Sequence, residues 1–262
     1  MSVLLVAAGL FYTNAANRAQ QELTERGQVT DRISKAVDQV GSDKLDVRLG
    51  GMYALERLMR ESPGDQPNLV AVLCAYVRLH ATASPAGRAS PAAAEPLGPR
   101  AFVRPGLATD VQTALTIVAR RPRSGEHEEI DLSGADLSGA QLYSAKLAGA
   151  NLVEANLSGA MLIQADLSKA GLIGADLSRA ELAYSDLRDA ILFDTNLTDA
   201  NLYHANLADA DLGRALGLTT SQAKCADFNE RTLFPGVIKW PVPGHDDQDF
   251  GCVRVVVVSP PR

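Results

Sequence analysis

Hydrophobic and polar positions repeat with a period of five along the middle of the chain. Leucine stands at every fifth position from Leu132 to Leu212, in 17 consecutive pentads that cover residues 130–214. The residue two positions before each leucine is alanine in all but three pentads, where it is Ile130, Ser185 or Thr195. A period of five fits neither an α-helix, which repeats every 3.6 residues, nor a flat strand, which repeats every two. The pattern therefore predicts a stacked structure whose own repeat is five residues long.

The residues within each pentad indicate a thin tube. The leucine and the alanine two positions before it lie on one side of an extended segment, because side chains alternate along a strand. The residue between them is usually Asp or Asn, as at Asp136 and Asn156, and therefore faces outward. Glycine often follows two positions after the leucine, as at Gly134 and Gly149, where the chain has to turn. Leucine then fills the axis, and the small alanine lets the backbone turn close to it.

These pentads resemble the pentapeptide-repeat family, whose motif is A(D/N)LXX. Residues 134–138 (Gly-Ala-Asp-Leu-Ser) and 149–153 (Gly-Ala-Asn-Leu-Val) match the motif closely. The resemblance implies a right-handed, four-sided β-helix with one pentad on each side, so that four pentads complete a coil. Residues 130–214 then form about four coils and one further side, roughly 20 Å long at about 4.8 Å between neighbouring strands. We therefore predict a mainly β fold, a right-handed quadrilateral β-helix, preceded by an α-helical region.

The four-sided arrangement predicts which side chains share a face, because residues one coil apart stack on each other. Two opposite faces collect apolar side chains, whereas the other two are polar. The candidate protein-contact residues are Val153, Ile173, Ile191 and Phe193 on the first face, and Tyr143, Met161, Ile163, Tyr184 and Tyr203 on the third. Contiguous exposed apolar surface usually marks a contact. Either the chain's own N-terminal helices or C-terminal tail cover such a face, or it binds a partner or a second copy.

The chain begins with a hydrophobic segment, residues 1–16. Its apolar run from Val3 to Tyr12 is about half of what crosses a bilayer. The run is typical of the second half of a transmembrane helix that ends with aromatic residues at the interface, and the alternative is an ordinary hydrophobic helix. No Lys or Arg precedes the run, which argues against a signal peptide. We expect a membrane-anchored protein with cytoplasmic repeats, and a cytoplasmic protein is the alternative.

Residues 17–82 predict an α-helical region with helices near 17–40, 43–61 and 67–82. Ser42 is placed to cap the second helix, and Pro67 suits the first turn of the third. The pair Gly50-Gly51 weakens the second helix, so we expect a neighbouring backbone to approach closely there.

The sequence before the repeats carries a second resemblance. The segments Leu23 to Arg32 and Gly41 to Arg57 are similar to the region that precedes the repeats in a group of actinobacterial pentapeptide-repeat proteins. A transmembrane segment commonly precedes this region in that group, which favours the anchor.

Two further segments lead into the repeats. Residues 83–106 are rich in Ala, Pro, Ser and Gly, a composition typical of a linker. Residues 107–129 predict a capping helix and lead-in, with the helix running from Thr109, as N-cap, to Arg120. Terminal coils of repeat proteins need caps, so we expect this helix to seal the N-terminal mouth of the tube.

Residues 215–262 predict a C-terminal cap and tail. A short capping helix is expected near 218–222, and the segment 232–236 with Trp240-Pro241 resembles the usual exit of such a tube. The apolar run from Val253 to Val258 could add a strand to the open edge of the last coil.

Charge and cysteine usage narrow the function. Residues 130–214 hold 12 acidic and 5 basic residues, within a chain of net charge −6. The repeat region therefore lacks the basic surface that direct nucleic-acid binding requires. An acidic rod could instead bind in a basic groove of another protein. Cys74, Cys225 and Cys252 are far apart and form no CxxC pair, which indicates a reducing compartment without structural disulfides or a zinc site.

The sequence offers no pattern typical of catalysis. It contains no phosphate-binding loop, dinucleotide fingerprint, metalloprotease helix or nucleophile elbow. The acidic run after His245 could attract a cation, but a solvated loop is the simpler interpretation. Asp166 and Asp186 should stack on the fourth face, which can raise a carboxyl pKa, yet no cleft is expected there. We predict no catalytic residues, no cofactor and no metal site.

These features predict a non-enzymatic scaffold for protein–protein interaction, tethered at the cytoplasmic face of the membrane. It would present a rigid surface to an unknown protein partner or to a second copy. The alternative is inhibition or protection of DNA gyrase by DNA mimicry, as the resemblance to quinolone-resistance pentapeptide-repeat proteins implies. The acidic tube agrees with this alternative. The short tube and the preceding linker and helices depart from it.

Overall fold

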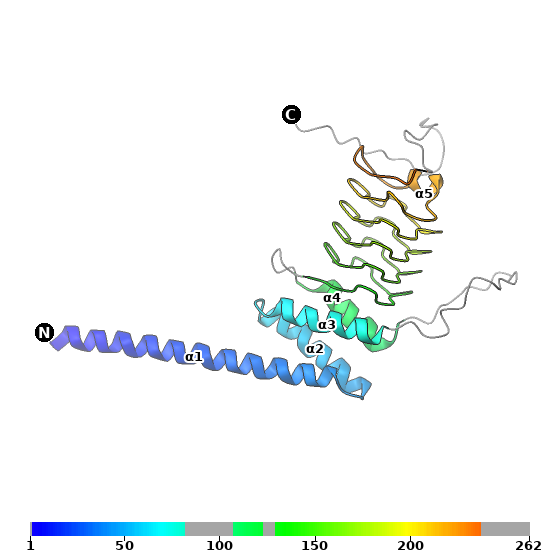
Figure 1. Cartoon of the computed structure of the whole chain (residues 1–262). Coiled ribbons are helices and arrows are strands. Elements are labelled where there is room, and N and C mark those ends of the chain that lie inside the picture. Colours follow the sequence, from blue (N-terminus) through cyan, green and yellow to red (C-terminus); the bar gives the residue numbers. More distant parts are fainter. Residues whose placement is uncertain (1, 82–106, 123–128, 237–262) are drawn as a thin grey trace, which may run out of the picture. The chain divides into compact units, whose positions relative to one another are not determined.

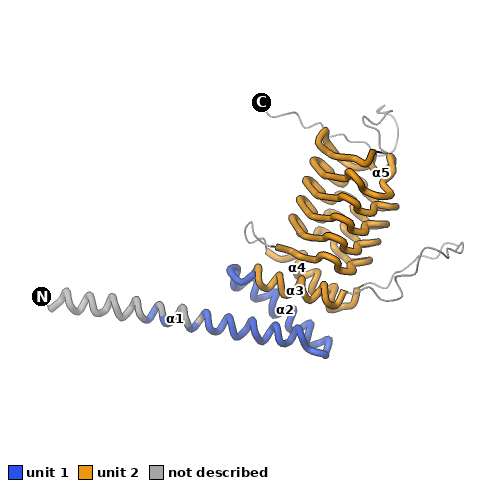
Figure 2. Tube along the Cα trace, viewed as in Figure 1, with its two compact units in different colours: residues 1–66 blue, residues 67–262 orange. Residues whose placement is uncertain are grey.

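A computed structural model describes residues 2–81, 107–122 and 129–236 (Figure 1). The linker at 83–106, part of the lead-in before residue 129 and the tail with Val253–Val258 lie outside the described residues. The chain divides into two compact units, residues 1–66 and residues 67–262 (Figure 2).

The first unit is a pair of helices, α1 (Ser2–Val40) and α2 (Leu45–Glu61). The predicted hydrophobic segment 1–16 and the predicted helix near 17–40 form one continuous helix, α1. The two helices contact each other. Among the side chains of this unit that the structure describes, the buried apolar ones are Ala36, Val40, Met52, Leu55, Leu58 and Met59. Within the described part of the chain, no helix combines the length and the apolar character that crossing a membrane requires. The predicted transmembrane anchor is therefore unsupported.

Gly51 marks a close approach of α1 and α2, as the glycine pair predicted. A Cβ atom built on Gly51 would lie 2.7 Å from the carbonyl oxygen of Ala36 and 2.8 Å from the backbone nitrogen of Val40. Gly50, one position earlier, is exposed and has nothing within 4 Å of such an atom. Only the second glycine is therefore required by packing.

Two predicted helix caps are wrong. Lys44, not Ser42, is the N-cap of α2, and the Ser42 hydroxyl accepts a 3.2 Å hydrogen bond from the Lys44 amide before the helix begins. Ala108, not Thr109, is the N-cap of α4, so Thr109 is already inside the helix. In both cases the residue with a suitable capping side chain lies one or two positions away from the actual N-cap.

The second unit contains α3 (Gln66–His80, which begins at the unit boundary), α4 (Thr109–Arg120) and a tube built by residues 130–234. Pro67 lies in the first turn of α3, as expected. Parallel bridges join residues one coil apart, beginning with Asp131 and Asn151 and recurring every five residues. The amide of Leu132 donates to the carbonyl of Asn151 at 2.9 Å, and the amide of Asn151 donates to the carbonyl of Ile130 at 2.8 Å. Each side holds a single bridged residue between two turns, which makes the extended segments very short.

Turns at the corners close each coil. In the first pentad the amide of Ala135 donates to the carbonyl of Leu132 at 3.3 Å, and Gly134 between them has φ of +66°. A positive φ at the third residue of a turn favours glycine. Yet 11 residues other than glycine also adopt it here, all at this same place in their pentads, for example Tyr184 (φ +59°) and His204 (φ +52°). The leucines are buried along the axis, so their packing holds these corners in place.

The N-terminal mouth of the tube is sealed by α3 and α4. The carbonyl of Ala81, the residue directly after α3, accepts from the amide of Asp136 at 2.9 Å. Gln112 of α4 pairs its side-chain amide with the backbone of Gln141, accepting at 2.9 Å and donating at 3.0 Å, as a preceding coil would. On the fourth face, Lys146 donates its amide to Ala119 at 2.9 Å. Three sides of the first coil thus find substitute partners.

The C-terminal end continues past the last leucine of the period. Bridges pair Asn196 with Leu216, Asn206 with Asp227 and Asp211 with Leu233, so the offset grows from 20 to 21 and 22 residues. The short helix α5 (Thr220–Lys224) stands where the third side of this coil would be, and Thr219 and Gln222 form its capping box. The parallel pairing therefore extends beyond residue 214, where the sequence period ends.

Candidate interaction surface

No chemistry-bearing cluster stands out among the described residues. They contain no group of three or more His, Cys, Asp or Glu side chains arranged to hold a metal ion. Burial raises the pKa of the Cys74 thiol to about 11, so this cysteine stays protonated at neutral pH. The surface of the tube is therefore the candidate functional site.

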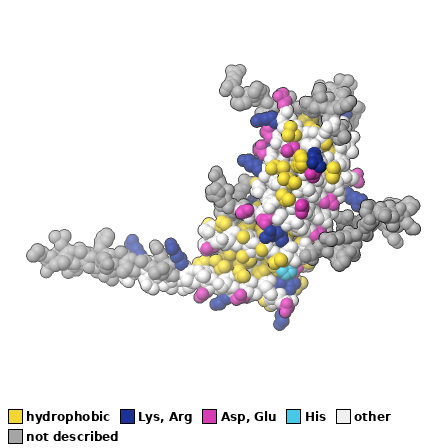
Figure 3. All heavy atoms as spheres, viewed as in Figure 1, with side chains coloured by type: hydrophobic (Ala, Val, Ile, Leu, Met, Phe, Trp, Pro, Cys, Tyr) yellow, Lys and Arg dark blue, Asp and Glu magenta, His cyan; other side chains and the backbone are white. Residues whose placement is uncertain are grey.

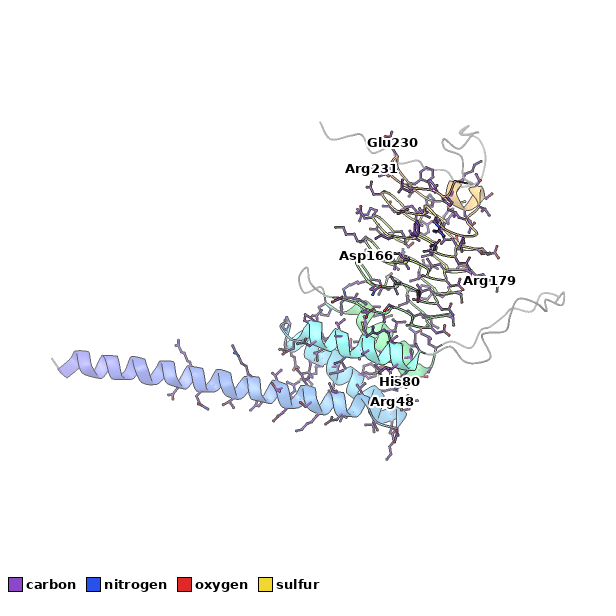
Figure 4. All side chains as sticks on the ribbon, viewed as in Figure 1. Arg48, His80, Asp166, Arg179, Glu230 and Arg231 are labelled. Atoms are coloured by element: carbon purple, nitrogen blue, oxygen red, sulfur yellow. The ribbon has the colours of Figure 1, made fainter. Side chains whose placement is uncertain are left out.

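The carboxylate pair on the fourth face behaves differently from the prediction. Asp166 and Asp186 are bridged between coils. The Arg188 guanidinium, 2.5 Å from Asp186, holds the pKa of the Asp186 carboxyl below its usual range rather than raising it. A neighbouring cation dominates over the stacked carboxylate. Figure 4 shows Asp166 on the opposite side of the tube from Arg179, which follows the second face.

The first face carries an apolar centre. Ile173 and Ile191 are 40% and 44% exposed, while Val153 and Phe193 beside them are half-buried. Val153, Ile173 and Phe193 follow one another in a single row, each one coil from the next. Figure 3 shows hydrophobic side chains gathered on the side of the tube turned toward the viewer, with both acidic and basic side chains around them.

One end of this apolar row is ordered by a cation. The guanidinium carbon of Arg214 lies 5.0 Å from the centre of the Phe193 ring, and Arg214 also pairs with Asp194 at 3.0 Å. A guanidinium over a ring face is attracted by the ring electrons. Phe193 is therefore held in one position by a contact that the residue pattern did not reveal.

The third face carries an aromatic cluster at its C-terminal end. The Tyr184 ring stacks on His204, with centroids 5.4 Å apart, and Tyr203 meets both rings edge-on. Tyr143, Tyr184 and Tyr203 are exposed, whereas Met161 and Ile163 are half-buried.

The cluster borders the last coil, because the imidazole Nδ1 of His204 lies 3.9 Å from Asp227. The sequence pattern did not place Asp227 beside this cluster. The period of five no longer applies by residue 227.

The predicted candidates thus fall into two groups on opposite faces, and the structure brings neither group into contact with the other. Among the described helices of the second unit, none is seen to cover either apolar face. α3 and α4 bond to the first coil, and the Gln222 side chain of α5 bonds to the carbonyl of Leu197 at 2.8 Å. These contacts lie at the two ends of the tube.

The second face is polar and internally bonded. Asn156 donates its side-chain amide to Asp136 at 2.8 Å, and Asn196 donates to Asp176 at 3.1 Å. The same oxygens accept from the backbone two residues ahead, as in the bond from the Ser138 amide to Asp136. These outward polar residues support the corners of the tube, which is an architectural role.

The stacked coils, the leucine axis and the motif define the class of this chain. Eight copies of the family model described as pentapeptide repeats match it, over residues 128–159, 140–179, 155–194 and 180–216. The chain belongs to the pentapeptide-repeat family, whose members are right-handed quadrilateral β-helices. The predicted fold is confirmed for the tube, and the helical region before it is present.

Solved structures similar to the chain are pentapeptide-repeat proteins. HetL of Nostoc sp. strain PCC 7120, involved in heterocyst differentiation regulation, is 35% identical over 38% of this chain and 50% of its own, with a TM-score of 0.22. The protein alr5209 of the same cyanobacterium is 33% identical over 42% of this chain and 77% of its own, with a TM-score of 0.14. QnrB1, a plasmid-mediated fluoroquinolone resistance protein, is 17% identical over 41% and 56%, with a TM-score of 0.23.

These likenesses have a limited extent. The chain spans half of the length of HetL and about as much of QnrB1. The comparison with curated proteins gave no match. The family assignment rests on the repeats, and these relatives' roles do not transfer with it.

Proposed function

We propose that this protein is a non-enzymatic scaffold whose first face binds a protein partner. The observation that carries the proposal is the apolar centre formed by Val153, Ile173, Ile191 and Phe193. Outward positions on the second and fourth faces are mostly polar, and a free surface gains nothing from an apolar row. The backbone bonds between coils make the tube a rigid support, so little entropy is lost when its surface binds.

The proposal is tested by replacing the apolar row without disturbing the axis. The double variant Ile173→Asp/Phe193→Asp changes outward side chains only. Ser178→Asp/Thr198→Asp is its matched control, because these residues occupy the same row on the polar second face. We expect both variants to keep the circular dichroism and the unfolding midpoint of the wild type.

The contact itself is measured with a photo-crosslinking amino acid at position 173 or 198 in cells that make the protein. A discrete adduct is expected from position 173, and it should disappear when Phe193→Asp is added. Equal adducts from both positions, or none from 173, would refute the proposal. Unfolding of the double variant but not of its control would show that the face is internal packing.

The predicted membrane tether is a separate question, because no helix in the described part of the chain could span a membrane. Fractionation of the untagged protein decides it. Release by detergent but not by a carbonate wash would establish an integral anchor, and recovery in the soluble fraction would remove it.

A second candidate, action on DNA gyrase by DNA mimicry, is favoured by the acidity of the tube. Residues 130–214 contain 12 acidic and 5 basic residues. The likeness to QnrB1 at 17% identity concerns the fold alone. A supercoiling assay with gyrase tests this candidate, and unchanged supercoiling at micromolar protein would exclude it.

A further inference from the structure

The apolar centre of the first face is bordered by acidic side chains. Glu154 and Asp194 occupy the corner that follows it, while Asp189 and Asp209 occupy the corner that precedes it. Asp131 and Asp211 lie at the two ends of the same face. The basic residues on this border are Lys169 and Arg214.

Half of these carboxylates are already neutralised within the chain. Asp131 pairs with Arg78, Asp194 with Arg214 at 3.0 Å, and Asp209 with Arg231 at 2.8 Å. Figure 4 shows Arg231 at the C-terminal end of the tube.

The other half remain available. For Glu154, Asp189 and Asp211, the part of the chain that the structure describes provides no ion pair. Glu154 and Asp189 are exposed. The border therefore has a negative excess that a partner with positive charge would neutralise.

A partner of this face has to contact it through side chains, because the face offers no free backbone edge. Backbone amides and carbonyls of adjacent coils bond to each other along this face, as Gly174 does to Phe193 at 3.0 Å. A partner strand therefore finds no open edge to extend. Ile173 stands between Gly171 and Gly174, neither of which has a side chain, so it projects between two low points.

The length of the apolar row suits a helix. Val153 and Phe193 lie two coils apart, and two steps of about 4.8 Å span about 10 Å. This equals about two turns of an α-helix, whose residues at i, i+4 and i+7 form a continuous ridge. A second copy of this chain suits the face less well, because it would bring two negative borders together.

We infer that the first face accepts the apolar side of an amphipathic helix whose flanks carry Lys or Arg. This inference rests on the proposed function and names the chemical class of its partner. The apolar ridge covers Ile173 and its neighbours, and the basic flanks reach Glu154 on one corner and Asp189 on the other.

Gly171 offers a test of the charge requirement that leaves the fold alone. The equivalent outward position, directly before the leucine, is occupied by Asp131 and Asp211 in other coils of the same face and by Lys146 on another face. A Cβ atom there would meet nothing closer than the Val153 methyl at 3.9 Å. Gly171→Asp and Gly171→Lys therefore form a matched pair that differs in charge.

The probe is a fluorescent 18-residue peptide of Leu and Lys with the leucines on one helical face. A scrambled peptide of the same composition and an amphipathic peptide of Leu and Glu are its controls. Binding to the full chain is followed by fluorescence anisotropy at low and high salt, since exposed charge interactions are screened at high ionic strength.

We expect the amphipathic Leu/Lys peptide to bind and both controls to fail. Gly171→Lys should bind it about tenfold more weakly than Gly171→Asp at low salt, since two unit charges change at about 6 Å in a water-like medium. Ile173→Asp/Phe193→Asp should abolish binding although it adds negative charge. Retention by that variant would show mere attraction to an acidic protein and would overturn the inference.

Failure of the inference and failure of the proposed function give different results. Preference for the Leu/Glu peptide, or equal binding by the two Gly171 variants, would overturn the cationic partner while the in-cell adduct at position 173 still stands. Loss of that adduct would overturn the proposed function, whatever the peptides do.

Discussion

The crossing of α1 and α2 at Gly51 gives a prediction in which two adjacent substitutions act in opposite directions. Gly50→Ala adds a methyl group to an exposed position with open space around it, so it should stabilise α2 by about 0.5–1 kcal/mol through helix propensity alone. Gly51→Ala gains the same propensity. Its new Cβ atom would lie 2.7 Å from the Ala36 oxygen, 2.8 Å from the Val40 nitrogen and 2.8 Å from the Gln39 Cβ.

The magnitude follows from which atoms would have to move. Two of the three contacts are backbone atoms of α1, and the third is a Cβ atom, so no flexible side-chain end can yield. Overpacking of this kind costs about 1–3 kcal/mol. We expect Gly51→Ala to be destabilised by about 1 kcal/mol net, and the two variants to differ by about 2 kcal/mol.

The assay has to report on this helix pair, since a chain with two compact units need not unfold in one step. Native-state hydrogen exchange of the amides in α2 gives a local opening free energy. Faster exchange is expected in Gly51→Ala and slower exchange in Gly50→Ala. If Gly51→Ala protects α2 as well as Gly50→Ala does, the reasoning from the close approach is refuted.

Three further predictions concern the tube and its cap. Ser185→Ala should stabilise the fold by about 1 kcal/mol, because the buried Ser185 hydroxyl has no hydrogen-bond partner in the described chain. Thr195→Ala should destabilise the fold, because it loses a buried 2.7 Å hydrogen bond. Urea unfolding compares the two variants, and equal shifts of their unfolding midpoints would contradict this prediction. Gln112→Ala should leave first-coil backbone groups unpaired and cost about 1–3 kcal/mol, with faster amide exchange confined to that coil; unchanged exchange would rule out the capping role. The attraction between Arg188 and Asp186 should stabilise the fold above the ordinary carboxyl pKa of about 3.9 and disappear as the pH falls through the lower folded pKa. The stability difference between wild type and Arg188→Gln should therefore be complete at neutral pH and shrink as the pH falls below about 3.9, and a difference that does not shrink would contradict it.

The sequence was sufficient for the tube because its period belongs to no other regular structure. Every leucine of the period lies on the axis, and counting in steps of 20 places Ile173 one coil from Val153 and from Phe193, as the bridges show. The prediction of a close contact at the glycine pair also holds, although only the structure shows that Gly51 makes it. These successes depend on signals that repeat or that have a single physical cause.

The features that sequence reasoning missed depend on where a backbone turns or on contacts outside the period. Ser42 and Thr109 both have the chemistry of a cap, but the helices begin at other residues. Arg188 decides the pKa of Asp186 because its guanidinium folds back by two residues, which a stacking argument along the coil ignores. The contact of Arg214 with Phe193 is likewise a side-chain conformation and not a pattern.

The growing offset of the last bridges affects how such a chain can change in length. Each coil sets the register of the next, so an extra residue built into an early coil would carry every later leucine off the axis and turn every later face by part of a corner. Among the described residues no further coil follows the last one, and this coil holds the two extra residues between its bridges as well as α5. Insertions of any size can therefore accumulate at this end during evolution, while the earlier coils can be gained or lost only whole.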